Sequence, residues 1–213
     1  MNRRIFSFIA ASFAAVLALS APLAARAADE APDALVKRLS SDVLDTIKAD
    51  KSLQGGDINK IIALVDSKIM PNVNFQRMTA AAVGPGWRQA TPAQQKRLQE
   101  EFKTLLVRTY SGALAQVSDQ TITIKPLRAS PEDKDLLVRS EVVGKGEPIQ
   151  LDYRLEKTPG QGAGWKIYNL NVMGVWLVET YRSQFAQEIN AKGVDGLIAA
   201  LELRNQRNAQ AKN

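Results

Sequence analysis

The chain has 213 residues and contains no cysteine and no histidine. These two absences exclude disulfides, thiolate redox chemistry, Ser-His-Asp and Cys-His nucleophilic sites, and the usual zinc sites. The fold must therefore be held together by packing alone. Acid-base chemistry by Asp, Glu, Lys or Tyr stays open, but the missing residue types make an enzyme the less favoured interpretation.

Long apolar runs are also scarce, apart from one near the N-terminus. Arg3 and Arg4 precede an uncharged apolar stretch over 5–19, and the small-x-small sequence of 25–27 follows it. This pattern is typical of a cleavable export signal over 1–27. The stretch is shorter than the roughly 20 apolar residues of a membrane span, although an uncleaved N-terminal anchor is the alternative. We expect the mature chain to begin near Ala28, outside the cytoplasm, with no lipid-modified cysteine.

A strong excess of one charge is missing as well. The chain carries 28 Lys and Arg against 22 Asp and Glu, but Arg3, Arg4 and Arg26 lie in the expected signal. The mature chain therefore has 25 basic residues against 22 acidic ones. It lacks the clustered basic stripe with interleaved aromatic residues that nucleic-acid-binding proteins show. We expect no nucleic-acid partner.

The first predicted elements of the mature chain are amphipathic helices over 31–118. Apolar residues recur at helical spacing over 31–51, and further helices are expected over 57–70, with Asp57 as N-cap, and over 74–83. The clearest helix follows Thr91, a predicted N-cap whose capping box Gln94 completes. Its apolar stripe runs to Val117.

From Asp119 the apolar period changes from 3.6 to 2, which predicts strands. Runs over 121–127, 135–143, 149–155 and 165–172, joined by short turn-rich segments, predict an antiparallel meander of four strands with one apolar face. The fourth run changes phase near Asn169, as a β-bulge that bends the sheet would cause, although an edge irregularity fits too.

Helices are expected again from Gly174, and a polar tail from Asn205. The element order is therefore that of an α+β domain. Its apolar faces exceed what a compact two-layer fold needs. A cavity between the strands and the helices that begin at Pro92 and Gly174 is one solution. A filled core is the other, and dense packing of interiors favours it.

Five blocks of sequence resemble a known family in their order and spacing. They are Ile69-Met70-Pro71-Asn72-Val73-Asn74-Phe75 with Met78-Thr79; Gly86-Trp87-Arg88-Gln89-Ala90-Thr91-Pro92-Ala93-Gln94-Gln95; Glu101-Phe102-Lys103-Thr104-Leu105-Leu106-Val107-Arg108-Thr109-Tyr110; Trp165-Lys166-Ile167-Tyr168; and Gly174-Val175-Trp176-Leu177-Val178-Glu179-Thr180-Tyr181-Arg182-Ser183-Gln184-Phe185. The family is that of the MlaC periplasmic phospholipid-binding proteins, also called the toluene-tolerance auxiliary family, and the resemblance spans about 35–203. Two positions depart from its pattern: Asn169 replaces an expected acid, and Trp176 replaces a small hydroxyl residue.

The resemblance implies a periplasmic carrier that shuttles phospholipid between the outer and inner membranes and maintains outer-membrane lipid asymmetry. The implied partners are an outer-membrane lipoprotein complex and an inner-membrane ABC transporter with its lipid-channel subunit. The implied fold is a curved four-stranded antiparallel sheet of the NTF2-like or cystatin-like kind, packed with a helical subdomain. The lipid cavity would lie between them, with phospholipid as cargo and no cofactor, metal or catalytic residue.

The resulting domain plan has one lipid-binding unit. It comprises the signal (1–27), the domain (28–204, with a helical part 31–118, a sheet 120–173 and C-terminal helices 174–204) and the polar tail (205–213). The residues expected to line the cavity all lie on apolar stripes. They are Met78, Leu106, Tyr110, Leu114, Ile124, Val138, Leu151, Tyr153, Val172, Val175, Trp176, Tyr181 and Phe185.

Two other functions stay open at this point. One is a carrier for another hydrophobic ligand, such as a sterol or a polyprenoid, which the large Trp176 ring would suit. The other is a small acid-base enzyme on the same fold, with Glu141, Asp152 and Glu179 as candidates. Strand alternation places Asp152 opposite the expected cavity, which weakens the second. Arg88, Arg154 and Arg182 are expected at the surface, where a lipid phosphate or a partner is the alternative contact.

Overall fold

The computed structural model of the protein describes residues 30–130 and 132–210, so the expected export signal lies outside the described residues. The helices are α1 (Pro32–Ala49), α2 (Lys51–Gln54), α3 (Ile58–Leu64), a π-helix (Val65–Ile69), a 3-10 helix (Met70–Asn72), α4 (Phe75–Val83), α5 (Gly86–Gln89), α6 (Pro92–Ala115) and α7 (Leu177–Gln210). The strands are β1 (Thr121–Ile124), β2 (Asp135–Val143), β3 (Ile149–Lys157), β4 (Trp165–Val172) and β5 (Val175–Trp176). No helix among the described residues is long and apolar enough to cross a membrane.

The α+β class and the antiparallel meander are confirmed, with one strand more than predicted. The sheet has the order β1-β2-β3-β4-β5, and every neighbouring pair is antiparallel. The fifth strand, Val175–Trp176, is only two residues long and turns back along β4 before α7 begins. The apolar character of this segment made it look like the first turn of the helix.

The β-bulge predicted near Asn169 is confirmed. Arg154 of β3 pairs with Asn169, but the next residue, Leu155, pairs with Ile167, so Tyr168 is the extra residue of β4. This insertion puts Trp165 and Ile167 on the same apolar face as the later residues of the strand. Outside the pairing, the Tyr168 ring lies under the guanidinium of Arg77 from α4, with Cζ 3.5 Å from the ring centroid.

Side-chain caps set the helix starts much as the sequence predicts. The Thr91 hydroxyl accepts a hydrogen bond from the backbone N–H of Gln94, whose side chain accepts one from the backbone N–H of Thr91, so the capping box is complete. The Asp57 carboxylate accepts bonds from two backbone N–H groups of α3. Each cap satisfies donors that the helix itself leaves unpaired.

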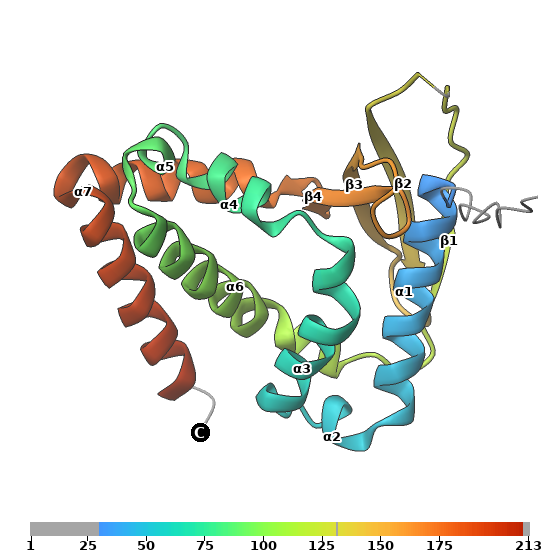
Figure 1. The fold of residues 1–213 in the computed structure, drawn as a ribbon. Coiled ribbons are helices and arrows are strands. Elements are labelled where there is room, and N and C mark those ends of the chain that lie inside the picture. Colours follow the sequence, from blue (N-terminus) through green and yellow to red (C-terminus); the bar gives the residue numbers. More distant parts are fainter. Residues whose placement is uncertain (1–29, 131, 211–213) are drawn as a thin grey trace, which may run out of the picture.

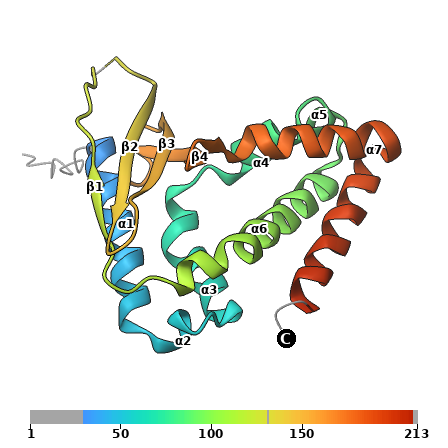
Figure 2. The same cartoon turned by 180° about the vertical axis from the view of Figure 1, so that it is seen from behind.

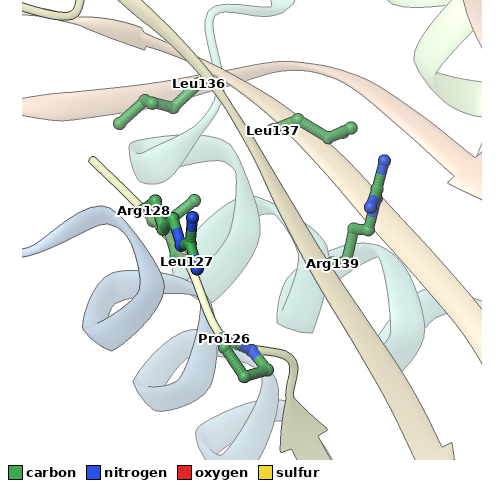
Figure 3. Close-up of a pocket in the computed structure, with 6 residues that line it drawn as sticks. All are labelled: Pro126, Leu127, Arg128, Leu136, Leu137 and Arg139. Atoms are coloured by element: carbon green, nitrogen blue, oxygen red, sulfur yellow. The ribbon is translucent and has the colours of Figure 1, made fainter. Parts of the chain in front are cut away.

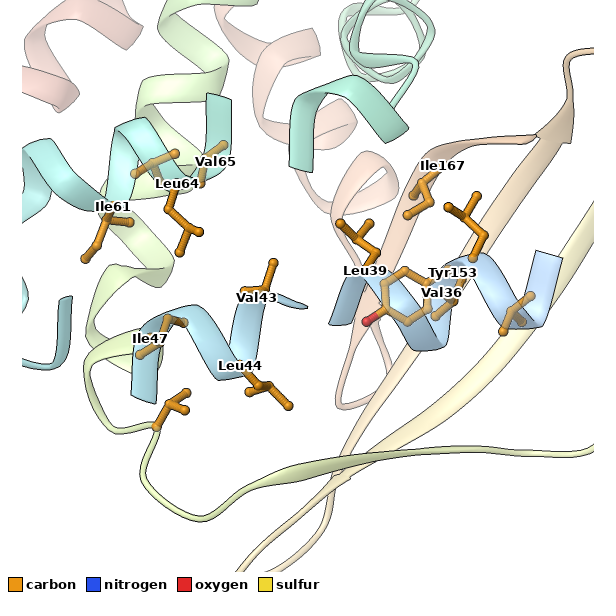
Figure 4. Close-up of a cluster of buried hydrophobic side chains, with 14 of the residues drawn as sticks. Val36, Leu39, Val43, Leu44, Ile47, Ile61, Leu64, Val65, Tyr153 and Ile167 are labelled. Atoms are coloured by element: carbon orange, nitrogen blue, oxygen red, sulfur yellow. The ribbon is translucent and has the colours of Figure 1, made fainter. Parts of the chain in front are cut away.

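Buried apolar side chains form two cores rather than one. The sheet core joins α1 and α3 to the apolar face of the sheet, with Leu35, Ile47, Ile61, Val138 and Leu155 almost inaccessible to solvent. Figure 4 shows how the α1 side chains of this core lie between the α3 residues and the strands. Val107 of α6 belongs to this core as well.

The helical core lies at the other end of the molecule, between α4, α6 and α7 (Figure 1). The Phe102 ring is its centre, with ring centroids of Phe75, Tyr181 and Phe185 at 5.7, 4.9 and 5.2 Å. Seen from behind, β4 leads from the sheet towards the start of α7 (Figure 2). Both α4 and α7 contact this strand.

Helix α7 consists of two helical halves that meet at Gly193, in agreement with the expected C-terminal helices, and its second half extends beyond 204. Gly193 has φ 69° and ψ −170°, a conformation that favours glycine, and here the helix bends back so that its second half packs along α6 (Figure 2). The segment from Asn205, expected as a polar tail, is helical as far as Gln210. Asn205 is buried, and its side-chain amide donates hydrogen bonds to the Glu101 backbone carbonyl and carboxylate.

Truncation of the central ring should show how much the helical core contributes to stability. We expect Phe102→Ala to lower the free energy of unfolding by about 3–5 kcal/mol, because it removes a fully buried ring and leaves a cavity. Chemical denaturation followed by circular dichroism measures this. Leu203→Ala, at a side chain of α7 that is 48% exposed, is the control and should cost less than about 1 kcal/mol.

Candidate functional site

Half-buried apolar side chains lie where the two cores meet. Met70, Val73 and Leu170 pack against both cores at once. We define the seam as these three residues together with the half-buried apolar residues of α6, β3 and β4 that pack against either core. The seam comprises Met70, Val73, Leu106, Tyr110, Leu114, Leu151, Leu170 and Val172.

One wall of the seam is a stripe on α6. Leu106, Tyr110 and Leu114 are spaced four residues apart and therefore lie on one side of the helix. Leu106 and Tyr110 pack against the helical core, whereas Leu114 packs against the sheet core. The stripe thus runs from one core to the other, and burial raises the pKa of the Tyr110 phenol within it.

The other wall is the apolar face of the sheet. Leu151 pairs with Val172, and Tyr153 pairs with Leu170, so these four side chains share one face. Helix α1 covers this face over β1 and β2. The seam lies beside that cover, over β3 and β4, where its side chains stay half-buried.

Few polar groups interrupt the apolar face. The Tyr153 and Ser40 hydroxyls share a hydrogen bond of 3.3 Å, and the Ser140 hydroxyl donates one of 2.8 Å to the Leu151 carbonyl. Burial raises the pKa of the Tyr153 phenol, so this group is neutral at physiological pH. The site offers a long apolar surface with hydroxyl groups and no fixed charge among the seam residues.

The opposite face of the sheet carries charge. The Arg154 guanidinium donates to the Glu179 carboxylate at 2.9 Å and lies over the Trp176 ring, 4.2 Å from its centroid. The Asn169 carbonyl oxygen accepts from the backbone N–H of Val178, near the start of α7, while its amide donates to Glu179. This network joins α7 to the outer face of the sheet.

The structure distributes the thirteen residues predicted to line a cavity over four environments. Leu106, Tyr110, Leu114, Leu151 and Val172 lie in the seam. Val138 and Tyr153 are buried in the sheet core, with Ile124 half-buried against it, and Met78, Tyr181 and Phe185 are buried in the helical core. Val175 is 50% exposed, and Trp176 pairs with Asn171 on the charged face of the sheet.

Three seam residues were not among those predicted. Met70 and Val73 belong to a sequence block that signals the family, but Met70 ends the helix expected over 57–70 and Val73 lies between two expected helices, so no face could be assigned to them. Leu170 could have been identified from the sequence, because it is one of the apolar residues after the phase change in β4.

The carboxylates considered for acid-base chemistry all lie away from the seam. Glu141 forms an ion pair with Lys125 at 2.6 Å, and Glu179 forms one with Arg154. Asp152 is on the charged face, as strand alternation predicts, but it is buried and accepts a hydrogen bond from the Gln150 amide. Among the described residues, no group of acidic side chains is placed to hold a metal ion.

Two hollows open elsewhere on the molecule. One, of about 400 Å³, lies beside β2 where the chain leaves β1, between Leu127, Leu136 and two exposed arginines, Arg128 and Arg139 (Figure 3). The other, of about 290 Å³, is a polar hollow between α6 and the second half of α7. Neither contains a seam residue.

Comparison with known proteins gives matches over most of the chain. The profile of a family described as MlaC protein matches residues 37–203. The toluene tolerance protein ttg2D of Pseudomonas putida is 30% identical over 182 residues, covering 84% of this chain and 82% of that protein. The intermembrane phospholipid transport system binding protein MlaC of Haemophilus influenzae is 23% identical over 177 residues, or 82% of each chain.

A solved structure is more similar still in sequence. It is that of a phospholipid-binding protein from Ralstonia solanacearum in complex with a phospholipid. It is 50% identical to this chain, superposes with a TM-score of 0.79, and the match covers 83% of this chain and 98% of that one.

The raised pKa of Tyr153 makes a prediction about alkaline stability. The unfolded chain ionises this tyrosine near its usual pKa of 10.0, while the folded state holds the proton to higher pH. The stabilisation is therefore complete below pH 10 and is lost as pH rises through the folded pKa. We expect Tyr153→Phe to make the free energy of unfolding fall less steeply between about pH 9 and 11. Urea titrations at several pH values test this, and an unchanged slope would contradict it.

Proposed function

The chain belongs to the MlaC family, and on that premise we propose that it is a periplasmic phospholipid-binding protein that carries phospholipid between the outer and inner membranes. The phospholipid-bound relative at 50% identity is the observation that carries the proposal. The seam supports it, since it gives this chain a half-buried apolar surface where its two cores meet. Residues 28–204 act as one lipid-binding unit.

The energetics of carriage fit an apolar seam without catalytic groups. Two acyl chains contain on the order of 30 methylenes, and hiding them from water gains roughly 24 kcal/mol at about 0.8 kcal/mol each. A bilayer hides the same chains equally well, so the free energy of transfer between membrane and carrier is close to zero. The net direction of phospholipid transfer must then be set by partner proteins and by the energy that they supply.

Acyl chains enter the seam by moving its side chains aside. The seam side chains are only half-buried, whereas the residues that form the two cores are buried. Displacing the seam side chains therefore costs fewer packing contacts than opening either core, and the acyl chains replace the lost contacts with their own. The lipid headgroup stays at the mouth, because the seam residues offer it no charge.

The partners follow from the same family membership. We infer that the carrier exchanges phospholipid with an inner-membrane ABC transporter through its lipid-channel subunit and with an outer-membrane lipoprotein complex, which together maintain lipid asymmetry. The chain is then a transport component and not an enzyme, and phospholipid is its cargo rather than a cofactor. Glu141 and Glu179, held in ion pairs outside the seam, agree with this.

Mass spectrometry of the bound lipid tests the proposal directly. We expect an organic extract of protein purified from the periplasm without detergent to contain phospholipid at close to one molecule per chain. A sterol or polyprenoid in its place would instead indicate a carrier for another ligand. Folded protein that contains no lipid would contradict carriage altogether.

A charge placed in the helical wall should prevent binding. We expect Leu106→Asp to lower the phospholipid content at least about tenfold, because a carboxylate facing the acyl chains must be desolvated. Lipid content per folded chain is measured by mass spectrometry, with circular dichroism to confirm folding.

Thr109→Asp is the matched control for this variant. Thr109 lies on the same helix but is exposed, so the same carboxylate there should leave the lipid content unchanged. Equal lipid content in the two folded variants would mean that the α6 stripe does not contact the acyl chains.

A further inference from the structure

Exposed apolar side chains gather at one end of the sheet. Four large hydrophobic residues of the described chain are exposed, and three of them, Ile149, Met173 and Val175, are 38%, 68% and 50% accessible. The backbone N–H of Met173 donates to the Gln150 carbonyl at 3.0 Å, which holds the β4–β5 turn against the start of β3. We define the lip as Ile149, Met173 and Val175.

The turn that carries Met173 has a residue type that is unusual for its backbone conformation. Val172 and Val175 pair across a two-residue loop in which Met173 has φ 51° and Gly174 has φ 86°. Positive φ at both positions is the pattern of a type I′ turn, whose first position favours Asn, Asp or Gly. Met173 is the one residue other than glycine with positive φ in the described chain. An exposed methionine in this conformation contributes nothing to the turn itself, so folding does not explain it.

The lip continues one wall of the seam to the surface. On the apolar face, Leu151 pairs with Val172, and Val172 pairs in turn with Val175. Ile149 lies two residues from Leu151 on the same strand and so points to the same face. The apolar surface therefore runs without interruption from half-buried seam residues to exposed lip residues.

We propose that the lip binds the acyl chains of phospholipid in transit, as the first apolar surface they meet on entering the seam and the last on leaving it. The inference rests on the proposed function and adds a second site to it. The three side chains suit hydrocarbon: two are aliphatic, and the unbranched thioether of Met173 adapts to chains of different shape. A lip of this kind lowers the barrier to transfer, because acyl chains then cross less water between the membrane and the seam.

A double variant removes the lip while keeping the turn. In Met173→Asn with Val175→Thr, Asn-Gly is the preferred type I′ sequence and threonine retains the strand preference, so the hairpin should form as before. The phospholipid content of the purified variant is measured in parallel, so that the transfer rate is expressed per loaded molecule. The rate of transfer of a fluorescent phospholipid from the protein to phosphatidylethanolamine–phosphatidylglycerol vesicles should fall about tenfold, since apolar contact is lost only during transit.

Leu203→Gln is the matched control, because it removes the fourth exposed hydrophobic side chain, which lies on α7 away from the lip. Its transfer rate should equal that of the wild type. An unchanged rate in the double variant, or an equal fall in Leu203→Gln, would overturn the lip while leaving phospholipid carriage intact. If the wild type itself holds no phospholipid, the proposed function fails, and the lip with it.

Discussion

The extra residue in β4 is the constraint on which the arrangement of the molecule depends. Without Tyr168, the alternation of the strand would send Trp165 and Ile167 to the face opposite Leu170 and Val172. With it, one strand contributes to the sheet core at its start and contacts the helical core at its end. Arg77 stacks on the displaced ring and also pairs with Glu156 and Asp135, so the bulge is fixed from outside.

The same bulge sets the start of the last helix. Asn169, beside the extra residue, caps α7 by accepting from the Val178 N–H, and its amide donates to Glu179. An acid, expected here from the resemblance, would also accept from that N–H but would face Glu179 with a like charge. The asparagine thus suits a chain in which Glu179 is already paired with Arg154 over Trp176.

Much of the fold could be predicted from sequence because local signals carried it. The capping box at Thr91, the cap at Asp57 and the phase change in β4 each identify a local conformation from a few residues. The fifth strand could not be predicted, because two apolar residues before a helix fit either state. The extension of α7 was missed because Asn205 is buried through a long-range bond to Glu101, for which a polar sequence gives no sign.

The candidate site was less predictable than the fold. Periodicity identifies an apolar face but not which part of it a neighbouring element covers, so Phe185 in a core and Leu106 in the seam look alike in sequence. Trp176 was misleading for a different reason. The face of the sheet on which Trp176 lies is set by its pairing with Asn171, in a strand that the sequence does not reveal.

The seam has a consequence for the surroundings in which such a carrier works. Its residues carry no titratable group apart from Tyr110, whose pKa is raised above the ordinary tyrosine value, and the whole chain has no histidine. No side chain with an ordinary pKa between about 5 and 8 is therefore available to alter the charge of the binding surface in that range. On the proposed function, the affinity of the seam for acyl chains is therefore insensitive to pH between about 5 and 8.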